Sequence, residues 1–141
     1  MKIKNYINGE FVNPILDNWI DNYNPSNGEI YSQIPNSSDI DLKNAFKAAK
    51  HAFPKWSEST LEKRSQILSN IAHLITKKLP ELAAAEAKDN GKPIELAKSI
   101  DIPRAAANFQ FFANAITQFA SETHDSVGLN AINFTLRQPI G

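Results

Sequence analysis

Residues 59–75 read STLEKRSQILSNIAHLI. Apolar side chains recur in this stretch at steps of three and four residues, which is the spacing of a helix with one buried face. Ser59, followed three residues later by Glu62, has the pattern of a capping box, so we expect the helix to begin there. This long amphipathic segment predicts a largely helical centre for the chain. Its apolar face comprises Leu61, Ile67, Leu68, Ile71, Leu74 and Ile75.

A second amphipathic segment precedes it, over residues 39–53. Ser38 can cap its first turn, and acidic residues in that turn suit the positive end of the helix dipole. Pro54 is expected to end this helix, because proline cannot donate the backbone hydrogen bond that a helix interior needs.

Two further helices are predicted downstream. Pro80 stands where a helix can start, and residues 89–93 (DNGKP) provide its stop signal, with Gly91 suited to the left-handed position after the last turn. The last helical stretch runs from about 94 to 119. Pro103 lies inside it, so we expect a boundary or kink near Ile102.

Strands are predicted at both ends of the chain. Residues 6–12 (YINGEFV) place Asn-Gly between β-favouring residues, the signal of a hairpin, and residues 19–34 suggest a second strand pair around a proline-glycine turn. Residues 131–141 form a closing strand after a loop over 121–130. The expected fold is therefore α+β: hairpins in 1–35, about four helices in 38–120, and a carboxy-terminal strand.

The closing strand has no predicted neighbour. A strand exposes backbone donors and acceptors along both edges, and no residue after Gly141 is available to pair with residues 132–136. We therefore expect self-association, or a homo-oligomer, through this strand.

Composition narrows the classes of function. The chain has 141 residues, of which 42% are hydrophobic and 21% charged, as in ordinary globular proteins. Lys plus Arg equals Asp plus Glu, 15 against 15, which argues against nucleic acid or an anionic membrane as the main partner. No apolar run approaches the roughly 20 residues of a membrane span, and the amino terminus lacks a signal-peptide core. The sequence is interpreted as a soluble, cytoplasmic protein.

Self-contained catalytic motifs are missing from the sequence. It has no cysteine, its three histidines lack metal-site spacing, and it contains no phosphate-binding glycine loop. Arg104 is the one unusual residue, because it follows Pro103 directly and is surrounded by alanines and apolar side chains. It is either a surface arginine or an anion clamp, and the residues alone favour the surface.

Taken together, six short motifs in sequence order resemble the amino-terminal portion of an aldehyde dehydrogenase. Each is weak alone, but their order and spacing are compatible with that family over nearly the whole chain. Position 27 departs from the pattern, because threonine is commoner there than asparagine. The motifs are residues 6–12 (the opening hairpin), 24–30 ("NPxTGE"), 49–56 ("AF…W"), 89–93 ("DNGKP"), 108–113 ("FxYYA") and 137–141 ("RxPxG").

The resemblance implies NAD(P)-dependent oxidation of an aldehyde to a carboxylic acid. Residues 99–104 and 108–109 are most similar to the branch that oxidises 2-aminomuconate or 2-hydroxymuconate semialdehyde. In that branch the arginine matching Arg104 is a substrate-carboxylate ligand, and a guanidinium fork suits that role because it stays charged and pairs bidentately. The alternative is a salt-bridged helix arginine.

The resemblance also implies a structural monovalent cation. In many relatives the aspartate of "DNGKP" and carbonyl oxygens before "NP" bind Na⁺ or K⁺, and the matching positions are Asp89, Asn22 and Tyr23. Oxygen ligands suit such hard cations. The alternative for Asp89 is a hydrogen-bond acceptor at a helix end.

The family's catalytic groups have no counterpart in these residues. The resemblance places the cysteine nucleophile, the glutamate base, the oxyanion donor and the NAD site beyond the "RxPxG" strand. The chain alone is thus expected to be an inactive piece of the fold that lacks the dinucleotide-binding sheet and binds no NAD. The alternatives are an autonomous helical interaction module and one half of a split enzyme.

Overall fold

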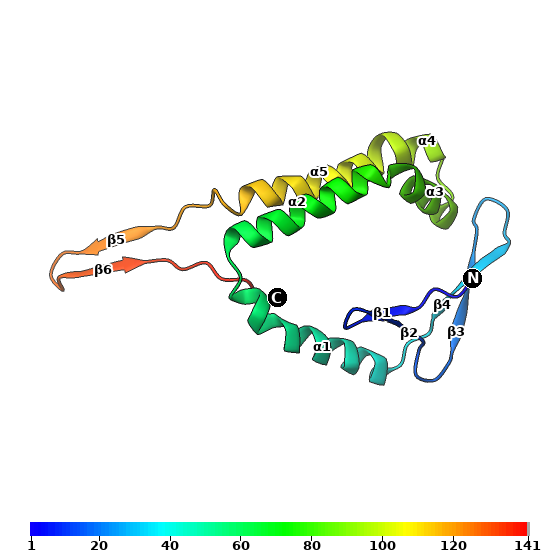
Figure 1. The fold of residues 1–141 in the computed structure, drawn as a ribbon, viewed down its shortest axis with the longest axis horizontal. Coiled ribbons are helices and arrows are strands. Elements are labelled where there is room, and N and C mark those ends of the chain that lie inside the picture. The colour runs from blue at the N-terminus through cyan, green and yellow to red at the C-terminus, as the bar shows by residue number, and fades with distance from the viewer. Residues whose placement is uncertain (141) are drawn as a thin grey trace.

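The computed structural model describes residues 1–140. In this part of the chain, two β-hairpins are followed by helices and then by a third hairpin (Figure 1). The α+β class, with amino-terminal hairpins and about four helices, is therefore confirmed. None of the helices in this range is both long and apolar enough to cross a membrane.

The first hairpin forms where the Asn-Gly pair predicts it. Strand β1 (Asn5–Ile7) pairs antiparallel with β2 (Glu10–Val12). Asn8 and Gly9 both have positive φ, 55° and 84°, which is the backbone of the turn type that matches the twist of two paired strands.

The second hairpin joins β3 (Trp19–Tyr23) to β4 (Ile30–Pro35). Its turn is closed by the backbone N–H of Gly28, which donates to the carbonyl of Asn24 at 2.8 Å. The register slips between Asn22 and Tyr23, so β4 carries an extra residue at that point.

Helix α1 runs from Asp39 to Ser57, four residues beyond its predicted end. Pro54 lies inside the last turn and does not stop the helix. Its own N–H is missing, but its carbonyl accepts from the backbone N–H of Glu58 at 3.1 Å and from the hydroxyl of Ser57 at 2.9 Å. A proline this close to the end removes one bond without disturbing the turn that follows.

Helix α2 (Leu61–Lys77) begins one residue later than the predicted capping box. Thr60, not Ser59, caps it, and the Thr60 hydroxyl accepts from the backbone N–H of Lys63 at 3.2 Å. The Ser59 hydroxyl instead donates to the carbonyl of Trp56 at 2.5 Å, at the end of α1. Both residues can cap a helix, and the short link between α1 and α2 decides which one does.

Helix α3 (Leu79–Asn90) ends at Gly91, whose φ of +78° is the predicted left-handed cap. A short helix α4 (Ile94–Leu96) follows and continues into the π-helical segment η1 (Ala97–Asp101). Helix α5 (Ile102–Ala115) then begins at the boundary that Pro103 predicts. It ends at Ala115, so the predicted extension to 119 is wrong.

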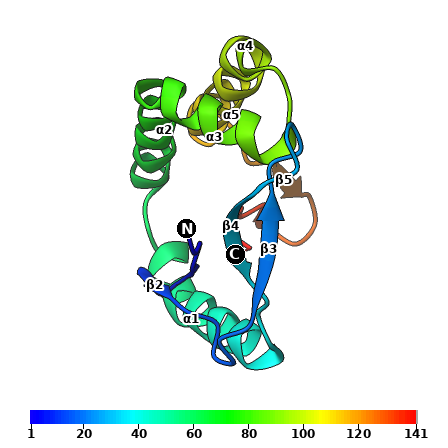
Figure 2. The same cartoon turned by 90° about the vertical axis from the view of Figure 1, so that its right-hand side faces the viewer.

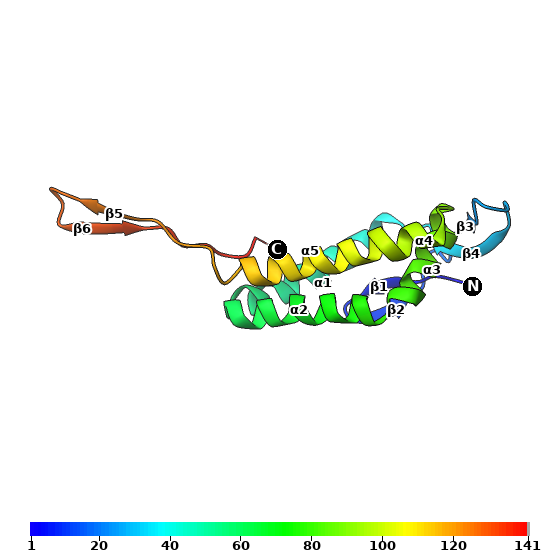
Figure 3. The ribbon, with the colours of Figure 1, turned by 90° about the horizontal axis from the view of Figure 1, so that it is seen from above.

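Helices α2 and α5 lie side by side and run antiparallel (Figures 1 and 3). The hydroxyl of Ser65 in the first half of α2 donates to the carbonyl of Ala113 near the end of α5, at 2.7 Å. Small side chains at the contact allow the two helices to approach closely. The buried apolar residues of the described chain are all alanines: Ala72, Ala83, Ala97, Ala106 and Ala113.

The closing strand is paired, which corrects the sequence prediction. Strand β6 (Ala131–Phe134) forms an antiparallel hairpin with β5 (Thr123–Ser126), inside the segment expected to be a loop. Thr123–Ser126 lacks apolar alternation, so its pairing comes from the hairpin turn and not from a hydrophobic pattern. Figures 1 and 3 show this hairpin projecting past the ends of α2 and α5.

Large apolar side chains remain on the outside. Leu42 and Phe46 of α1 are 68% and 65% exposed, and Phe111 of α5 is 64% exposed. Figure 2 shows that α1 lies apart from α2, α3 and α5, with β3 and β4 to one side. Within residues 1–140 no other helix packs extensively on α1, so its apolar face stays exposed.

Candidate functional site

Two loops that are far apart in sequence meet at one corner of the molecule. Gly91, in the DNGKP segment, lies against Pro25 of the β3–β4 turn. A Cβ atom added to Gly91 would lie 3.0 Å from the Cβ of Pro25. Glycine at this position thus serves both the left-handed backbone and the close approach of the turn.

A hydrogen-bonded cluster forms beside this contact. The amide of Asn22 in β3 donates to Oδ1 of Asp89 at 3.0 Å and to the hydroxyl of Tyr31 at 2.9 Å. The Tyr31 hydroxyl in turn donates to the same carboxylate oxygen at 2.5 Å. The ammonium group of Lys88 lies 4.8 Å from the centre of the Tyr31 ring. The last turn of α3 is thereby tied to both strands of the second hairpin.

The hydrogen bonds of this cluster shift the pKa values of Asp89 and Tyr31 in opposite directions. The pKa of Asp89 is lowered, mainly by the hydrogen bond from Tyr31 and then by that from Asn22. The pKa of Tyr31 is raised, mainly because its proton is held by the Asp89 carboxylate. The arrangement therefore favours an ionised Asp89 beside a protonated Tyr31.

The resemblance implies a monovalent cation held by the Asp89 carboxylate and by backbone carbonyls at Asn22 and Tyr23. Asn22 lies next to Asp89, because its side-chain amide donates to that carboxylate, and Tyr23 follows Asn22 at the end of β3. Among the described residues no three His, Asp or Glu side chains gather at one point, so a cation here would depend on amide and carbonyl oxygens. The carboxylate already accepts two hydrogen bonds, as the alternative reading of Asp89 expects.

Tyr31 is the member of the cluster that the sequence did not reveal. It lies 58 residues from Asp89, and its place in β4 becomes clear only once the slip at Asn22 is known. A half-buried tyrosine in a strand otherwise carries no signal of a specific partner.

A second polar cluster holds the π-helical segment. The ammonium group of Lys92 contacts Oδ2 of Asp101 at 2.6 Å and Oε1 of Glu86 at 3.1 Å. The pKa of Lys92 is raised, first by the hydrogen bond to Asp101 and then by that to Glu86. The end of η1 is thus joined to the last turns of α3, a few residues before Arg104.

Arg104 lies on the outer face of α5. Helical geometry places it about 160° around the axis from Ala106, which is buried against α2. Its side chain is exposed, and within residues 1–140 it has neither an ion-pair partner nor a side-chain hydrogen bond. Ile100 and Phe111, both exposed, lie on the same face. The salt-bridged alternative for Arg104 therefore has no acid to support it in this part of the chain.

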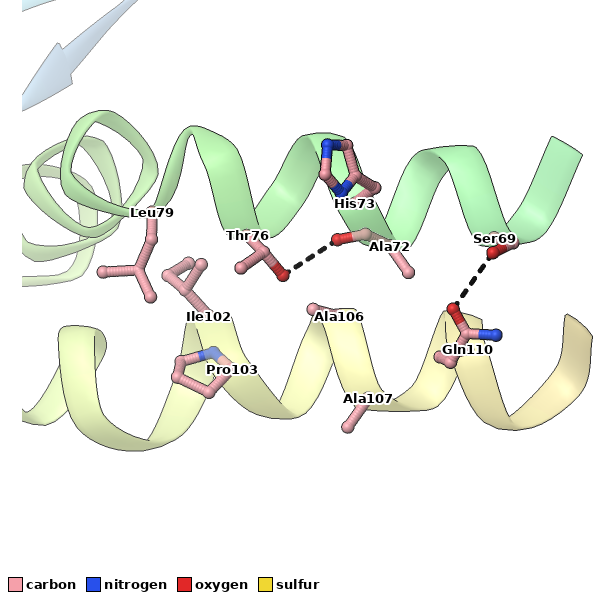
Figure 4. Close-up of a pocket in the computed structure, with 10 residues that line it drawn as sticks. All are labelled: Ser69, Ala72, His73, Thr76, Leu79, Ile102, Pro103, Ala106, Ala107 and Gln110. Atoms are coloured by element: carbon pink, nitrogen blue, oxygen red, sulfur yellow. Dashed lines mark hydrogen bonds between the residues drawn. The ribbon is translucent and has the colours of Figure 1, made fainter.

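The groove between α2 and α5 contains a pocket of about 470 Å³. Figure 4 shows Ser69 and Gln110 bonded across it, at 3.1 Å, and Thr76 bonded back to the carbonyl of Ala72, at 3.0 Å. Arg104 does not line this pocket. The groove and the guanidinium lie on different faces of α5, so they do not form one site.

Comparison with known proteins identifies a family. The model of the aldehyde dehydrogenase family matches residues 11–141. A 2-aminomuconic semialdehyde dehydrogenase of Bos taurus is 42% identical over all 141 residues, and that of Homo sapiens is 40% identical. A 2-hydroxymuconic semialdehyde dehydrogenase of Pseudomonas sp. (strain CF600) is 35% identical over 99% of the chain. The chain spans 28% to 30% of the length of these relatives.

Solved structures agree with this assignment. The NAD⁺ complex of an aldehyde dehydrogenase from Bacillus cereus has a TM-score of 0.89 at 32% identity, over 95% of this chain and 28% of that one. The complex of PnpE with nicotinamide adenine dinucleotide has a TM-score of 0.86 at 31% identity, over 89% of this chain and 26% of that one. The resemblance stated from the six motifs is thus confirmed.

Proposed function

This chain belongs to the aldehyde dehydrogenase family, and from that premise we propose that it forms the amino-terminal part of an NAD-dependent enzyme that oxidises a muconate semialdehyde to a carboxylic acid. The observation that carries the proposal is the 42% identity over all 141 residues to a 2-aminomuconic semialdehyde dehydrogenase. Two neighbouring structures hold NAD, which supports NAD over NADP as the oxidant.

Under this proposal the chain contributes a scaffold and one substrate contact. It contains no cysteine and no phosphate-binding glycine loop, so the nucleophile and the nucleotide site that the family resemblance implies are not among these 141 residues. We expect the 141-residue chain, mixed with NAD and an aldehyde, to show no turnover. NADH formation by the purified chain would contradict this division of roles.

Arg104 is proposed as the ligand of the substrate's carboxylate. Its guanidinium is exposed and has no acidic partner in residues 1–140, so its donors remain available to a ligand. The apolar side chains of Ile100 and Phe111 on the same face would limit water around the ion pair.

The test uses a polypeptide that contains these residues together with the catalytic half. Arg104→Ala should raise the KM for a muconate semialdehyde by about tenfold or more, the loss expected for one charge-assisted contact. The KM for an uncharged aldehyde of similar length should stay the same. Arg104→Lys should restore part of the loss, because it keeps the charge but not the fork. An unchanged KM for the semialdehyde in Arg104→Ala would refute the assignment.

A monovalent cation at Asp89 is proposed as a structural element. The lowered pKa of Asp89 keeps its carboxylate negative, and the backbone carbonyls at Asn22 and Tyr23 could add neutral oxygens. Replacing choline chloride by NaCl or KCl at equal ionic strength should raise the melting temperature of the wild type but not of Asp89→Asn. If the melting temperatures of the wild type and Asp89→Asn rise equally, the increase is a general salt effect and the cation site is refuted.

Self-association is proposed through the β5–β6 hairpin. Each of its strands pairs with the other and leaves one edge without a described partner, and Ile132 and Phe134 are exposed. A sedimentation profile that stays monomeric at high protein concentration would count against self-association through this hairpin.

The cytoplasmic location also remains a prediction, which cell fractionation would test.

The autonomous helical module is less well supported. Such a module would cover its apolar faces, whereas Leu42, Phe46 and Phe111 are more than half exposed. Strong binding of a hydrophobic dye alongside a cooperative melt would favour the enzyme scaffold. A split enzyme, in which a second polypeptide brings the catalytic half, would show activity when the two are mixed.

A further inference from the structure

The dipeptide Asn-Gly occurs three times in the chain, at residues 8–9, 27–28 and 90–91. An asparagine side chain reacts most readily with the backbone when glycine follows it, because glycine has no Cβ atom to hinder the approach of its own nitrogen. Residues 8–10 and 27–29 are moreover the same tripeptide, Asn-Gly-Glu. A difference in reactivity between these two sites would therefore reflect mainly their surroundings in the fold.

The reaction is an intramolecular loss of ammonia. The glycine nitrogen, after giving its proton to hydroxide, forms a bond to Cγ of the preceding asparagine. The Cγ–Nδ2 bond then breaks, and Nδ2 takes up a proton and leaves as ammonia. Water opens the resulting five-membered imide at one of its two carbonyls, which yields either aspartate or isoaspartate. The first step needs a glycine N–H without a hydrogen bond and an amide that can turn toward it.

At Asn27 both reacting groups are held by hydrogen bonds. The backbone N–H of Gly28 donates to the carbonyl of Asn24 at 2.8 Å. The Asn27 amide donates to Oε2 of Glu29 at 3.0 Å, and its Oδ1 accepts from the backbone N–H of the same residue at 3.1 Å. Attack on Cγ requires these bonds to break together, so the structure protects this site.

Asn90 is held in the same way at the end of α3. The backbone N–H of Gly91 donates to the carbonyl of Ala87 at 3.0 Å. The Asn90 amide donates to Oε1 of Glu86 at 2.6 Å, and its Oδ1 accepts from the backbone N–H of Lys92 at 3.0 Å. The second Asn-Gly site is thus protected as well.

Asn8 lies in a turn that provides none of these restraints. The two-residue turn between β1 and β2 is closed by the flanking pair, Ile7 and Glu10, so the turn itself does not use the N–H of Gly9. Within residues 1–140 neither that N–H nor the Asn8 side chain forms a hydrogen bond. Two strands of three residues hold the turn, and a hairpin of that size is only marginally stable by itself.

We propose that Asn8 is the site at which this protein loses ammonia, whereas Asn27 and Asn90 are protected by their hydrogen bonds. Isoaspartate has one more main-chain atom than asparagine, which a two-residue turn cannot accommodate without loss of register. Strand β1 is joined to the residue before the cap of α1, because the amide of Asn5 donates to the hydroxyl of Ser37 at 2.9 Å. The modification should therefore release the first hairpin from α1.

Peptide mapping by mass spectrometry tests the proposal on the 141-residue chain, incubated at mildly alkaline pH. In the folded chain Asn8 should convert at least about fivefold faster than Asn27 or Asn90, the factor that one hydrogen bond contributes to an opening equilibrium. In concentrated urea the three sites should convert at similar rates. If Asn8 is no faster than Asn27 in the folded chain, relative to their rates in urea, the proposal is overturned.

Two variants at matching positions test the cause of the protection. Glu29→Ala removes the acceptor of the Asn27 amide, so conversion of Asn27 should accelerate severalfold. Glu10→Ala should leave the rate at Asn8 unchanged, because within residues 1–140 the Glu10 side chain forms no hydrogen bond. Unaltered conversion of Asn27 in Glu29→Ala would show that hydrogen bonding does not decide which site reacts, and would refute the assignment.

Asn8→Asp separates the new charge from the longer main chain. This variant should keep the NMR resonance of the Asn5 amide at its wild-type position, because its turn retains the normal number of main-chain atoms. The isoaspartate form, isolated by chromatography from aged protein, should lose that resonance position. The same Asn5 resonance in all three samples would contradict the expected release of the hairpin.

Discussion

The phenolic hydroxyl of Tyr31 donates a 2.5 Å hydrogen bond to the carboxylate of Asp89, across 58 residues of sequence. This bond and that from Asn22 join the second hairpin to the end of α3. The β3–β4 hairpin has no extensive apolar contact with the helices, so its position depends strongly on these few polar groups and on the Gly91–Pro25 contact.

Tyr31→Phe should therefore make the protein less stable, with a pH dependence of known sign. The lowered pKa of Asp89 means that its contribution is present above the unfolded pKa, about 3.9, and is lost as pH falls through the folded value. The difference in melting temperature between wild type and Tyr31→Phe should be largest near neutral pH and shrink below about pH 4. A difference that is constant from pH 3 to 7 would show that the bond is not coupled to Asp89.

The same bond predicts a change at high pH. The raised pKa of Tyr31 means that its contribution is complete below the unfolded pKa, about 10, and is lost as pH rises through the folded value. Ultraviolet titration of tyrosinate should show one late-ionising tyrosine in the wild type. In Asp89→Asn that tyrosine should ionise earlier, whereas Asp21→Asn should leave it unchanged.

Gly91→Ala should lower the free energy of unfolding more than Gly28→Ala does. Both glycines have left-handed backbones, with φ of +78° and +74°, so both substitutions carry a similar backbone strain of about 1 kcal/mol. Only at Gly91 would the new Cβ meet a neighbour, Pro25 at 3.0 Å, while nothing lies within 4 Å at Gly28. Urea unfolding measures the free energy of unfolding of each variant. Equal destabilisation by the two substitutions would show that the β3–β4 turn at Pro25 can move away from residue 91 without loss of stability.

Lys92→Met should loosen the π-helical segment. Lys92 bridges Asp101 and Glu86, whereas Lys98 pairs with Glu95 on the exposed surface of its own turn. Hydrogen exchange of the amides in 97–101 should accelerate in Lys92→Met and change little in Lys98→Met. Because the pKa of Lys92 is raised, its ammonium group should deprotonate only above about pH 10, and the pairing with Asp101 and Glu86 should be lost there.

Ala113→Leu should destabilise the α2–α5 pair by about 1–3 kcal/mol, the usual cost of overpacking. Ala113 is fully buried and lies where Ser65 bonds its carbonyl, so the helices cannot separate without breaking that bond. Asn108→Leu, on an exposed part of α5 that does not line the α2–α5 pocket, is the control and should have little effect. Chemical denaturation of the two variants provides the comparison.

Local signals in the sequence were enough for the elements that local chemistry determines. The turn at Asn8-Gly9 and the cap at Gly91 both require backbones that few residues adopt, so their positions could be predicted. The end of α1 and the cap of α2 could not, because Pro54 and Ser59 each have two acceptable roles and the link between the helices selects one. Strand β5 has no apolar pattern and exists only through its partner.

The candidate sites divide in the same way. The motifs predicted that Asp89 and the backbone carbonyl of Asn22 share a cation, but not that the Asn22 side chain donates to Asp89. The position of Tyr31 beside them depends on a register slip that no sequence pattern reveals.

The π-helical turn determines where the rest of α5 points. The backbone N–H of Ile102 donates to the carbonyl of Ala97, five residues back instead of four, so η1 accommodates the equivalent of a one-residue insertion. Winding the same residues as a regular α-helix would rotate everything after them by about 100° about the axis. Ala106 would then no longer face α2, and Arg104 would no longer lie on the outer face of α5. A one-residue deletion within 97–101 should thus be tolerated better than a substitution that forces those five residues into an α-helix.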